Sequence, residues 1–301
     1  MQLLAWRDQG HYQPFGPHRI FCVESGGASR SADPERPALV LIHGFPTASW
    51  DFAKLWPALS DHFRVLTADL LGFGFSSKPR HHEYSIAEQA DVIEAVAREH
   101  GLRHFHVLAH DYGDTVAQEL LARDNARTAD RRLDSVCFLN GGLFPETHRP
   151  RLIQHLLAGP LGPLVSRLMN RASFGRSMTA VFGSDTPPTA EELDGFWALI
   201  REEAGHLLFH RLIRYMTERR RHRERWVGAL REARCPLALI DGAADPISGA
   251  HMVARYRELV GKGYVVELPG IGHYPQIEAP ELVLDHYLGW HRRISPQLGL
   301  G

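Results

Sequence analysis

Short apolar runs alternate along the chain with longer stretches whose apolar positions recur at helical spacing. Ala38–Ile42 is continuously apolar, which is typical of a strand buried on both faces of a parallel sheet. Ile86–Glu99 places Ile86, Ala90 and Ile93 on one face, as a helix packed on a sheet does. By the same reasoning the pattern predicts further strands and helices. The strands are Arg64–Leu70, Phe105–Ala109, Leu133–Leu139, Leu237–Ile240 and Tyr264–Leu268, and the helices are Thr115–Arg123, Gly249–Val260 and Pro280–His291.

The alternation is interrupted between about Gly142 and Arg234. This segment shows helical patterns broken by Pro and Gly, without a clear buried strand, and strands resume at Pro236. Such an interruption predicts an α/β fold: a mostly parallel central sheet flanked by helices and carrying an inserted helical cap. We therefore expect residues 1–141 and 236–301 to form one core and residues 142–235 to form the cap. An insertion also accounts for a length of 301 residues, which exceeds one ordinary core.

Composition and charge narrow the function classes. Lys and Arg number 34 against 35 Asp and Glu, so the formal net charge is -1, which argues against a general nucleic-acid binder. The arginine-rich stretch 218–225 also contains glutamates, and we interpret it as an exposed face of a cap helix. Three cysteines, no targeting signal and no long apolar stretch are typical of a cytoplasmic protein without a transmembrane segment. We expect no metal and no cofactor, because no HExxH or paired CxxC pattern occurs.

The sharpest chemical feature is the sequence HDYGD at 110–114, where a predicted buried strand turns directly into a helix. A G-x-S-x-G elbow in this context presents a serine nucleophile on a tight turn. Here Asp111 takes the place of the serine, and Gly113 keeps the small residue that lets helix and strand approach. A carboxylate is already ionised at neutral pH and can attack an sp3 carbon that bears a leaving group. The alternative interpretation is that Asp111 only caps the following helix.

Three further groups follow predicted strands and favour the nucleophile. His273 comes after the last strand, where a general base is expected, and Asp245 comes after the preceding strand, where an acid that orients the base is expected. The backbone N–H groups of Phe45 and Tyr112 can form an oxyanion hole. Asn140 is a second candidate for the orienting position, but an amide cannot balance an imidazolium charge.

These motifs resemble the α/β-hydrolase superfamily and, within it, the aspartate-nucleophile branch of epoxide hydrolases and haloalkane dehalogenases. The resemblance extends from Ala38 to His291 and includes the sequence DLLGFGFS at 69–76. The sequences NGGLFPETHRP at 140–150 and RWVGAL at 225–230 resemble the mesoderm-specific transcript protein subfamily. The resemblance implies two half-reactions: Asp111 forms an alkyl ester, and water activated by His273 then hydrolyses it. Because His273 must be neutral to act, we expect activity to fall at acid pH, near or somewhat below neutrality.

The leaving group separates the two branches. In dehalogenases a Trp often follows the nucleophile and binds the halide, whereas Tyr112 stands at that position here. Epoxide hydrolases commonly use two cap tyrosines to protonate the opening oxygen. Tyr215 is the one tyrosine of the predicted cap, so a substitute for the second is needed, and Tyr112, Tyr274 and His206 are candidates.

The resemblance therefore favours epoxide hydrolysis of a lipophilic small molecule, with water as the second reactant. Haloalkane dehalogenation is the alternative within the same chemistry, and a catalytically degenerate binding or scaffolding protein is the alternative of another class. We also expect the apolar segment 156–165 to form a hydrophobic rim at the mouth of the site, or else to pack the cap on the core. A monomer and a dimer are both compatible with the sequence.

Overall fold

The core is a single eight-stranded sheet with the order β1-β2-β4-β3-β5-β6-β7-β8. The computed structural model describes residues 1–26, 36–130 and 132–295. From β4 to β8 neighbouring strands run parallel, whereas β1 and β2 form an antiparallel hairpin whose second strand also pairs antiparallel with β4. The strands are β1 His11–Phe15, β2 His18–Glu24, β3 Ala38–Ile42, β4 Arg64–Ala68, β5 Phe105–Ala109, β6 Leu133–Leu139, β7 Leu237–Gly242 and β8 Tyr264–Leu268.

The six strands predicted from apolar runs are confirmed. β3, β5, β6 and β8 begin and end at the predicted residues, while β4 ends two residues earlier and β7 two residues later than expected. All five residues of β5 are buried, because helices cover both faces of the central sheet.

The hairpin of β1 and β2 was not predicted from the sequence. β1 buries Gln13 and exposes Tyr12 and Pro14, so its side chains do not follow the apolar-in, polar-out alternation that identifies a strand. Proline is tolerated there because β1 is an edge strand.

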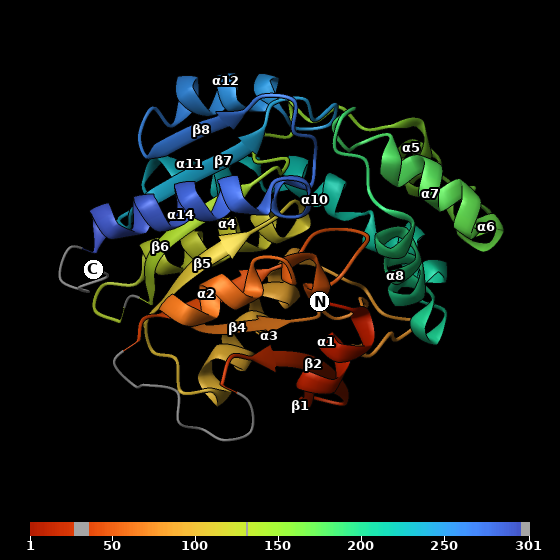
Figure 1. The fold of residues 1–301 in the computed structure, drawn as a ribbon, viewed down its shortest axis with the longest axis horizontal. Helices are drawn as coiled ribbons and strands as arrows, with labels where there is room; N and C mark the ends of the chain where they lie inside the picture. Colours follow the sequence, from red (N-terminus) through yellow and green to blue (C-terminus); the bar gives the residue numbers. More distant parts are fainter. Residues whose placement is uncertain (27–35, 131, 296–301) are drawn as a thin grey trace.

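Helices cover both faces of the sheet (Figure 1). On one face α4 packs against α3 and α11, and in Figure 1 α2 and α14 cross in front of the other face. The helices predicted from periodicity are confirmed, with ends that differ by a few residues. The predicted helices are α3 Ile86–Glu99, α4 Tyr112–Ala126, α12 Ala250–Leu259 and α14 Pro280–Ile294. The core also contains α1 Leu3–Gln9, α2 Trp56–His62, α13 Pro275–Glu278 and the 3-10 turn η1 Ser49–Phe52, which were not predicted.

The segment between β6 and β7 is helical throughout its regular elements, all of which lie in the described part of the chain. In Figure 1 α5 to α8 gather on the side of the molecule toward which the parallel strands point. The last helix, α11, instead packs along α4 of the core. The elements are α5 Leu152–Ala158, α6 Gly162–Leu168, α7 Arg171–Thr179, α8 Ala190–Arg201, η2 Glu202–Leu208, α9 Phe209–Leu212, α10 Tyr215–Arg221 and α11 Arg223–Arg231. Across the described residues, no helix has the length and apolar character needed to cross a membrane.

Candidate active site

Asp111 lies on a strained turn between β5 and α4. Its φ is 47° and its ψ is -102°, a conformation that side chains of L-residues rarely adopt. A Cβ at Gly113 would lie 2.2 Å from the carbonyl oxygen of Ile42, so only glycine fits where the helix meets β3. The Asp111 side chain makes no capping hydrogen bond to α4, which removes the interpretation of Asp111 as a simple helix cap.

The carboxylate of Asp111 accepts a hydrogen bond from the loop after β3. The backbone N–H of Phe45 donates to Asp111 Oδ2 at 3.2 Å. Gly44 permits this approach, because a Cβ there would lie 2.7 Å from His110 Nδ1 and 3.0 Å from Asp111 Cβ. Tyr112 is the first residue of α4 and its ring packs against that of Tyr215 at 5.0 Å between centroids. The backbone N–H groups of Phe45 and Tyr112 were expected to surround the Asp111 carboxylate. In the described structure the Phe45 N–H forms a hydrogen bond to this carboxylate.

His273 and Asp245 form a buried ion pair at the ends of β8 and β7. His273 Nδ1 lies 2.7 Å from Asp245 Oδ2. Burial alone would lower the pKa of His273, but Asp245, and after it Asp111 and Glu278, raise this pKa to about 9. Burial raises the pKa of Asp245, but the charge and hydrogen bond of His273 and further donors outweigh burial and lower it to about 2.

The surroundings of Asp245 fix its orientation. The backbone N–H groups of Ile247 and Ser248 donate to its carboxylate at 2.7 and 3.1 Å, and the Ser248 hydroxyl donates at 2.8 Å. Asn140 Nδ2 donates to the same carboxylate at 3.1 Å. Asn140 therefore holds the acid in place and does not replace it as the partner of His273.

A buried arginine beside Asp111 was not predicted. Arg219 is only 2% exposed, and its Nη2 lies 3.6 Å from Asp111 Oδ1. The same Nη2 donates to the Asp111 carbonyl oxygen at 2.9 Å, and Nε donates to Thr115 Oγ1 at 2.7 Å. The interpretation of stretch 218–225 as an exposed helix face is thus wrong for Arg219, although Arg220 and Arg221 are exposed.

A signal for Arg219 was present in the sequence. Tyr215 and Arg219 are four residues apart, so they lie on the same face of α10. The Arg219 guanidinium carbon lies 4.5 Å from the centroid of the Tyr215 ring, which is a cation–π contact. Tyr215 was predicted to face the nucleophile. A residue four positions later on the same helix face, Arg219, could have been predicted to do so as well.

Tyr215 and Tyr274, two of the candidate proton donors, occupy different positions. Tyr215 is buried, and it packs against Tyr112 and Phe45 without lining the cavity described below. Tyr274 lines the cavity next to His273. Burial is the main cause that raises the pKa of both phenols, and the charge of Asp111 adds to it at Tyr215, as the charges of Asp51 and Asp111 do at Tyr274. Both hydroxyls therefore stay neutral and can donate a proton.

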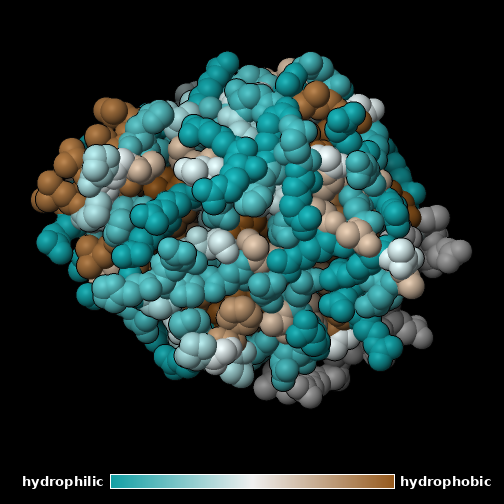
Figure 2. Space-filling model, turned by 180° about the vertical axis from the view of Figure 1, so that it is seen from behind, coloured by the Kyte–Doolittle hydropathy of each residue, from teal (hydrophilic) through white to brown (hydrophobic). Residues whose placement is uncertain are grey.

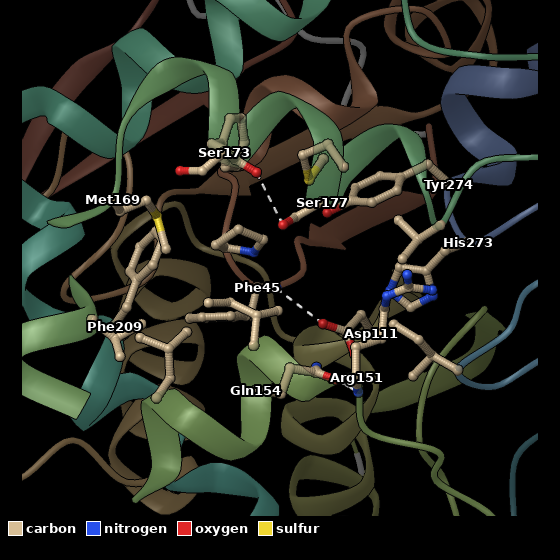
Figure 3. A pocket seen from close by; sticks show the side chains of 18 of the residues that line it. Phe45, Asp111, Arg151, Gln154, Met169, Ser173, Ser177, Phe209, His273 and Tyr274 are labelled. Atoms are coloured by element: carbon tan, nitrogen blue, oxygen red, sulfur yellow. Dashed lines mark hydrogen bonds between the residues drawn. The ribbon is translucent and has the colours of Figure 1, made fainter. Parts of the chain in front are cut away.

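A cavity of about 320 Å³ opens in front of Asp111. Figure 3 shows Asp111 and His273 on one side and Met169 and Phe209 on the other. Its wall is mostly apolar, and Leu157 and Val165 of the predicted rim segment belong to it. His206 does not belong to the lining found in the described part of the chain. The lining residues are Phe45, Pro46, Asp111, Arg151, Ile153, Gln154, Leu157, Val165, Leu168, Met169, Ser173, Phe174, Ser177, Met178, Val181, Phe209, Ile247, His273 and Tyr274.

Comparison with known proteins agrees with this arrangement of strands. Residues 37–280 match the family model described as alpha/beta hydrolase fold. The mesoderm-specific transcript protein of Mus musculus is 45% identical over 296 residues, which cover 96% of this chain and 87% of that protein. Among solved structures, a haloalkane dehalogenase DbeA-M1 loop variant from Bradyrhizobium elkanii has a TM-score of 0.79 at 20% identity, covering 95% of this chain and 97% of that one. The epoxide hydrolase CorEH has a TM-score of 0.75 at 20% identity, covering 95% and 99%. At these identities the two structures show a shared fold.

Proposed function

The chain belongs to the alpha/beta hydrolase fold family, and within it we propose a hydrolase that opens epoxides of lipophilic small molecules through a covalent ester on Asp111. The observation that carries the proposal is a carboxylate, held by the Phe45 N–H, that faces a mostly apolar cavity beside the His273–Asp245 pair. Residues 142–235 act as the cap that closes this cavity, and residues 1–141 and 236–301 supply the remaining groups.

In the first half-reaction a carboxylate oxygen of Asp111 attacks an epoxide carbon. The bond between that carbon and the ring oxygen breaks, and the electron pair moves to the oxygen, which takes a proton from a donor in the cavity wall. No charged leaving group departs, because the oxygen stays attached to the product. The apolar wall keeps water away from the carboxylate and so preserves its reactivity.

We assign the proton donor to Tyr274, because it lines the cavity and its phenol stays neutral. Tyr215, the donor expected from the sequence, is the alternative, since its neutral phenol also lies in the field of Asp111. Comparing the Tyr274→Phe and Tyr215→Phe variants decides between them: the donor's variant loses alkylation rate, whereas the other variant keeps it.

In the second half-reaction His273 takes a proton from water, and the oxygen of that water attacks the carboxyl carbon of Asp111. The negative charge develops on a carboxyl oxygen, where the N–H groups of Phe45 and Tyr112 stabilise it. The tetrahedral intermediate then expels the product alkoxide, which takes the proton from His273. The diol leaves, and the new carboxylic acid of Asp111 gives its remaining proton back to the tyrosinate formed in the first half-reaction, which restores both the carboxylate and the phenol.

Ester formation itself prepares His273 for this role. In the free enzyme the charge of Asp111 is one of the groups that raise the His273 pKa to about 9. The ester is neutral, so that contribution disappears and the pKa falls while the water is being activated. We therefore expect the rate of ester hydrolysis to fall below an apparent pKa that lies between the ordinary value of 6.5 and about 9. This pKa is higher than the sequence alone suggested, which was near or somewhat below neutrality.

The cavity wall favours an epoxide over a halide. Halide release needs N–H donors that cradle the anion. Within the described residues no tryptophan or asparagine side chain lines the cavity, and Arg151 and Gln154 are the lining residues there whose side chains carry N–H groups besides His273. Dehalogenation is the second candidate, because the same attack by Asp111 would displace a halide. Asp111, Asp245 and His273 all meet at one site, which argues against a degenerate binding protein.

The test is a product assay on a matched panel of terminal epoxides and haloalkanes with the same carbon skeletons. We expect diol from the epoxides, no halide from the haloalkanes, and no product from the Asp111→Ala variant. His155→Gln, at an exposed cap position, serves as the control that keeps activity. Halide release without diol would move the assignment to dehalogenation, and product from Asp111→Ala would exclude the proposed nucleophile.

A further inference from the structure

Five leucines of the cap project into solvent around α5 and α6. Leu152 and Leu156 belong to α5, Leu161 directly precedes α6, and Leu164 and Leu168 belong to α6; their exposed fractions are 74%, 39%, 57%, 53% and 67%. Figure 2 shows hydrophobic residues gathered at the left edge, the side on which the opposite view in Figure 1 places these helices. Exposed apolar patches of this kind mark interaction surfaces.

Both helices carry a broad apolar face that extends from the cavity wall out into solvent. Leu157 and Val165 line the cavity at the inner edge of this face, and the leucines at its outer part face solvent. A surface helix normally buries its apolar face and turns a polar face outward. We therefore expect the exposed leucines of α5 and α6 to bind another surface.

The charge around the patch indicates what covers it. No Asp or Glu occurs in residues 147–184, whereas this segment contains five arginines. Arg149, Arg167 and Arg176 are exposed, and Arg171 pairs with Asp194 outside the segment. An apolar segment that carries arginines and no carboxylates of its own is complementary to a membrane surface that contains anionic lipids.

We propose that α5 and α6 dock this protein on an anionic lipid bilayer, with the exposed leucines inserted at the boundary between head groups and acyl chains. A second copy of the chain fits less well, because a symmetric pair would bring the same arginines against each other. Leu168 is exposed and also lines the cavity, so the docked surface adjoins the cavity mouth. A lipophilic substrate dissolved in the bilayer would then reach Asp111 without crossing water. This last step rests on the proposed function, whereas the docking itself does not.

The docking is tested by co-sedimentation of the full chain with phosphatidylcholine vesicles, with and without phosphatidylglycerol. We expect the wild type to bind the vesicles that contain phosphatidylglycerol and to detach as salt is raised. The double variant Leu161→Ser/Leu164→Ser should bind roughly tenfold or more weakly, because it removes two apolar side chains from the contact. The matched control is Leu4→Ser/Leu282→Ser, at positions 71% and 46% exposed on α1 and α14, and it should bind as the wild type does.

Three outcomes would overturn the proposal. One is no binding of the wild type to either vesicle, and another is an equal loss of binding in the test and control variants. The third is a wild-type dimer in light scattering that Leu161→Ser/Leu164→Ser dissociates, together with no vesicle binding, which would assign the patch to a second copy. The assay needs no turnover, so repeating it with Asp111→Ala separates failure of the docking from failure of the proposed chemistry.

Discussion

The ion pair of His273 and Asp245 gives the protein a specific dependence of stability on pH. The perturbation is Asp245→Asn, which keeps the shape of the side chain but removes the charge that His273 contacts at 2.7 Å. The matched control is Asp194→Asn, which breaks the pair with Arg171 at a position whose side chain is 71% exposed.

The magnitude follows from the pKa of His273. A rise from 6.5 in the unfolded chain to about 9 in the folded protein corresponds to about 3 kcal/mol. Because the folded pKa is the higher one, this stabilisation is fully present below about pH 6.5 and is lost as pH rises through 9. The lowered pKa of Asp245 reflects the same ion pair, so its free-energy contribution is not added to that of His273.

The assay is chemical unfolding of the wild type and both variants at several pH values between 6 and 10. At pH 6 we expect Asp245→Asn to be less stable than the wild type by about 3 kcal/mol or more, since the hydrogen bonds from Ile247 and Ser248 are weakened as well. The difference should shrink by most of that amount toward pH 10, while Asp194→Asn stays within about 1 kcal/mol of the wild type throughout. A difference between wild type and Asp245→Asn that is constant with pH would refute the reasoning.

Three further predictions concern the nucleophile and the cavity. Arg219→Met should lower the free energy of unfolding by about 3–5 kcal/mol, because it leaves Asp111 without its buried counter-charge, whereas the exposed Arg220→Met should change it by about 0.5 kcal/mol or less; equal effects in chemical unfolding would contradict the role of the pair. Gly113→Ala should destabilise by about 1–3 kcal/mol or more and abolish turnover, since its Cβ would meet the carbonyl of Ile42. Gly228→Ala, in open space on α11, should instead stabilise by about 0.5–1 kcal/mol, and thermal melting of both variants checks the contrast. Leu157→Asn should raise KM for long apolar epoxides more than for short ones, and an equal rise for both would argue against its place in the substrate wall.

The parts of the fold that the sequence predicts are those whose burial leaves a simple pattern. β3 and β5 are buried on both faces, so their apolar runs mark their ends to the residue. The edge strand β1 is exposed at most positions and contains Pro14, so no periodicity marks it. Edge strands depend on pairing with a neighbour, which a local pattern does not record.

The same distinction applies to the site. Asp111, Asp245 and His273 could be chosen because each follows a strand, and parallel strands bring their carboxyl ends to one edge of the sheet. Arg219 could not be chosen in that way, since it reaches Asp111 from α10 across 108 positions of sequence. An arginine within an arginine-rich stretch is usually solvated. Arg219 is buried because α10 packs against the turn that carries Asp111.

The central claim is that Asp111 forms a covalent ester that His273 hydrolyses. The most direct measurement is intact-mass spectrometry of the His273→Gln variant incubated with an epoxide that the wild type converts to a diol. We predict an added mass equal to that of the epoxide, located on the peptide that contains Asp111 and missing from the double variant Asp111→Ala/His273→Gln. No added mass on His273→Gln, or the same added mass on the double variant, would contradict the account.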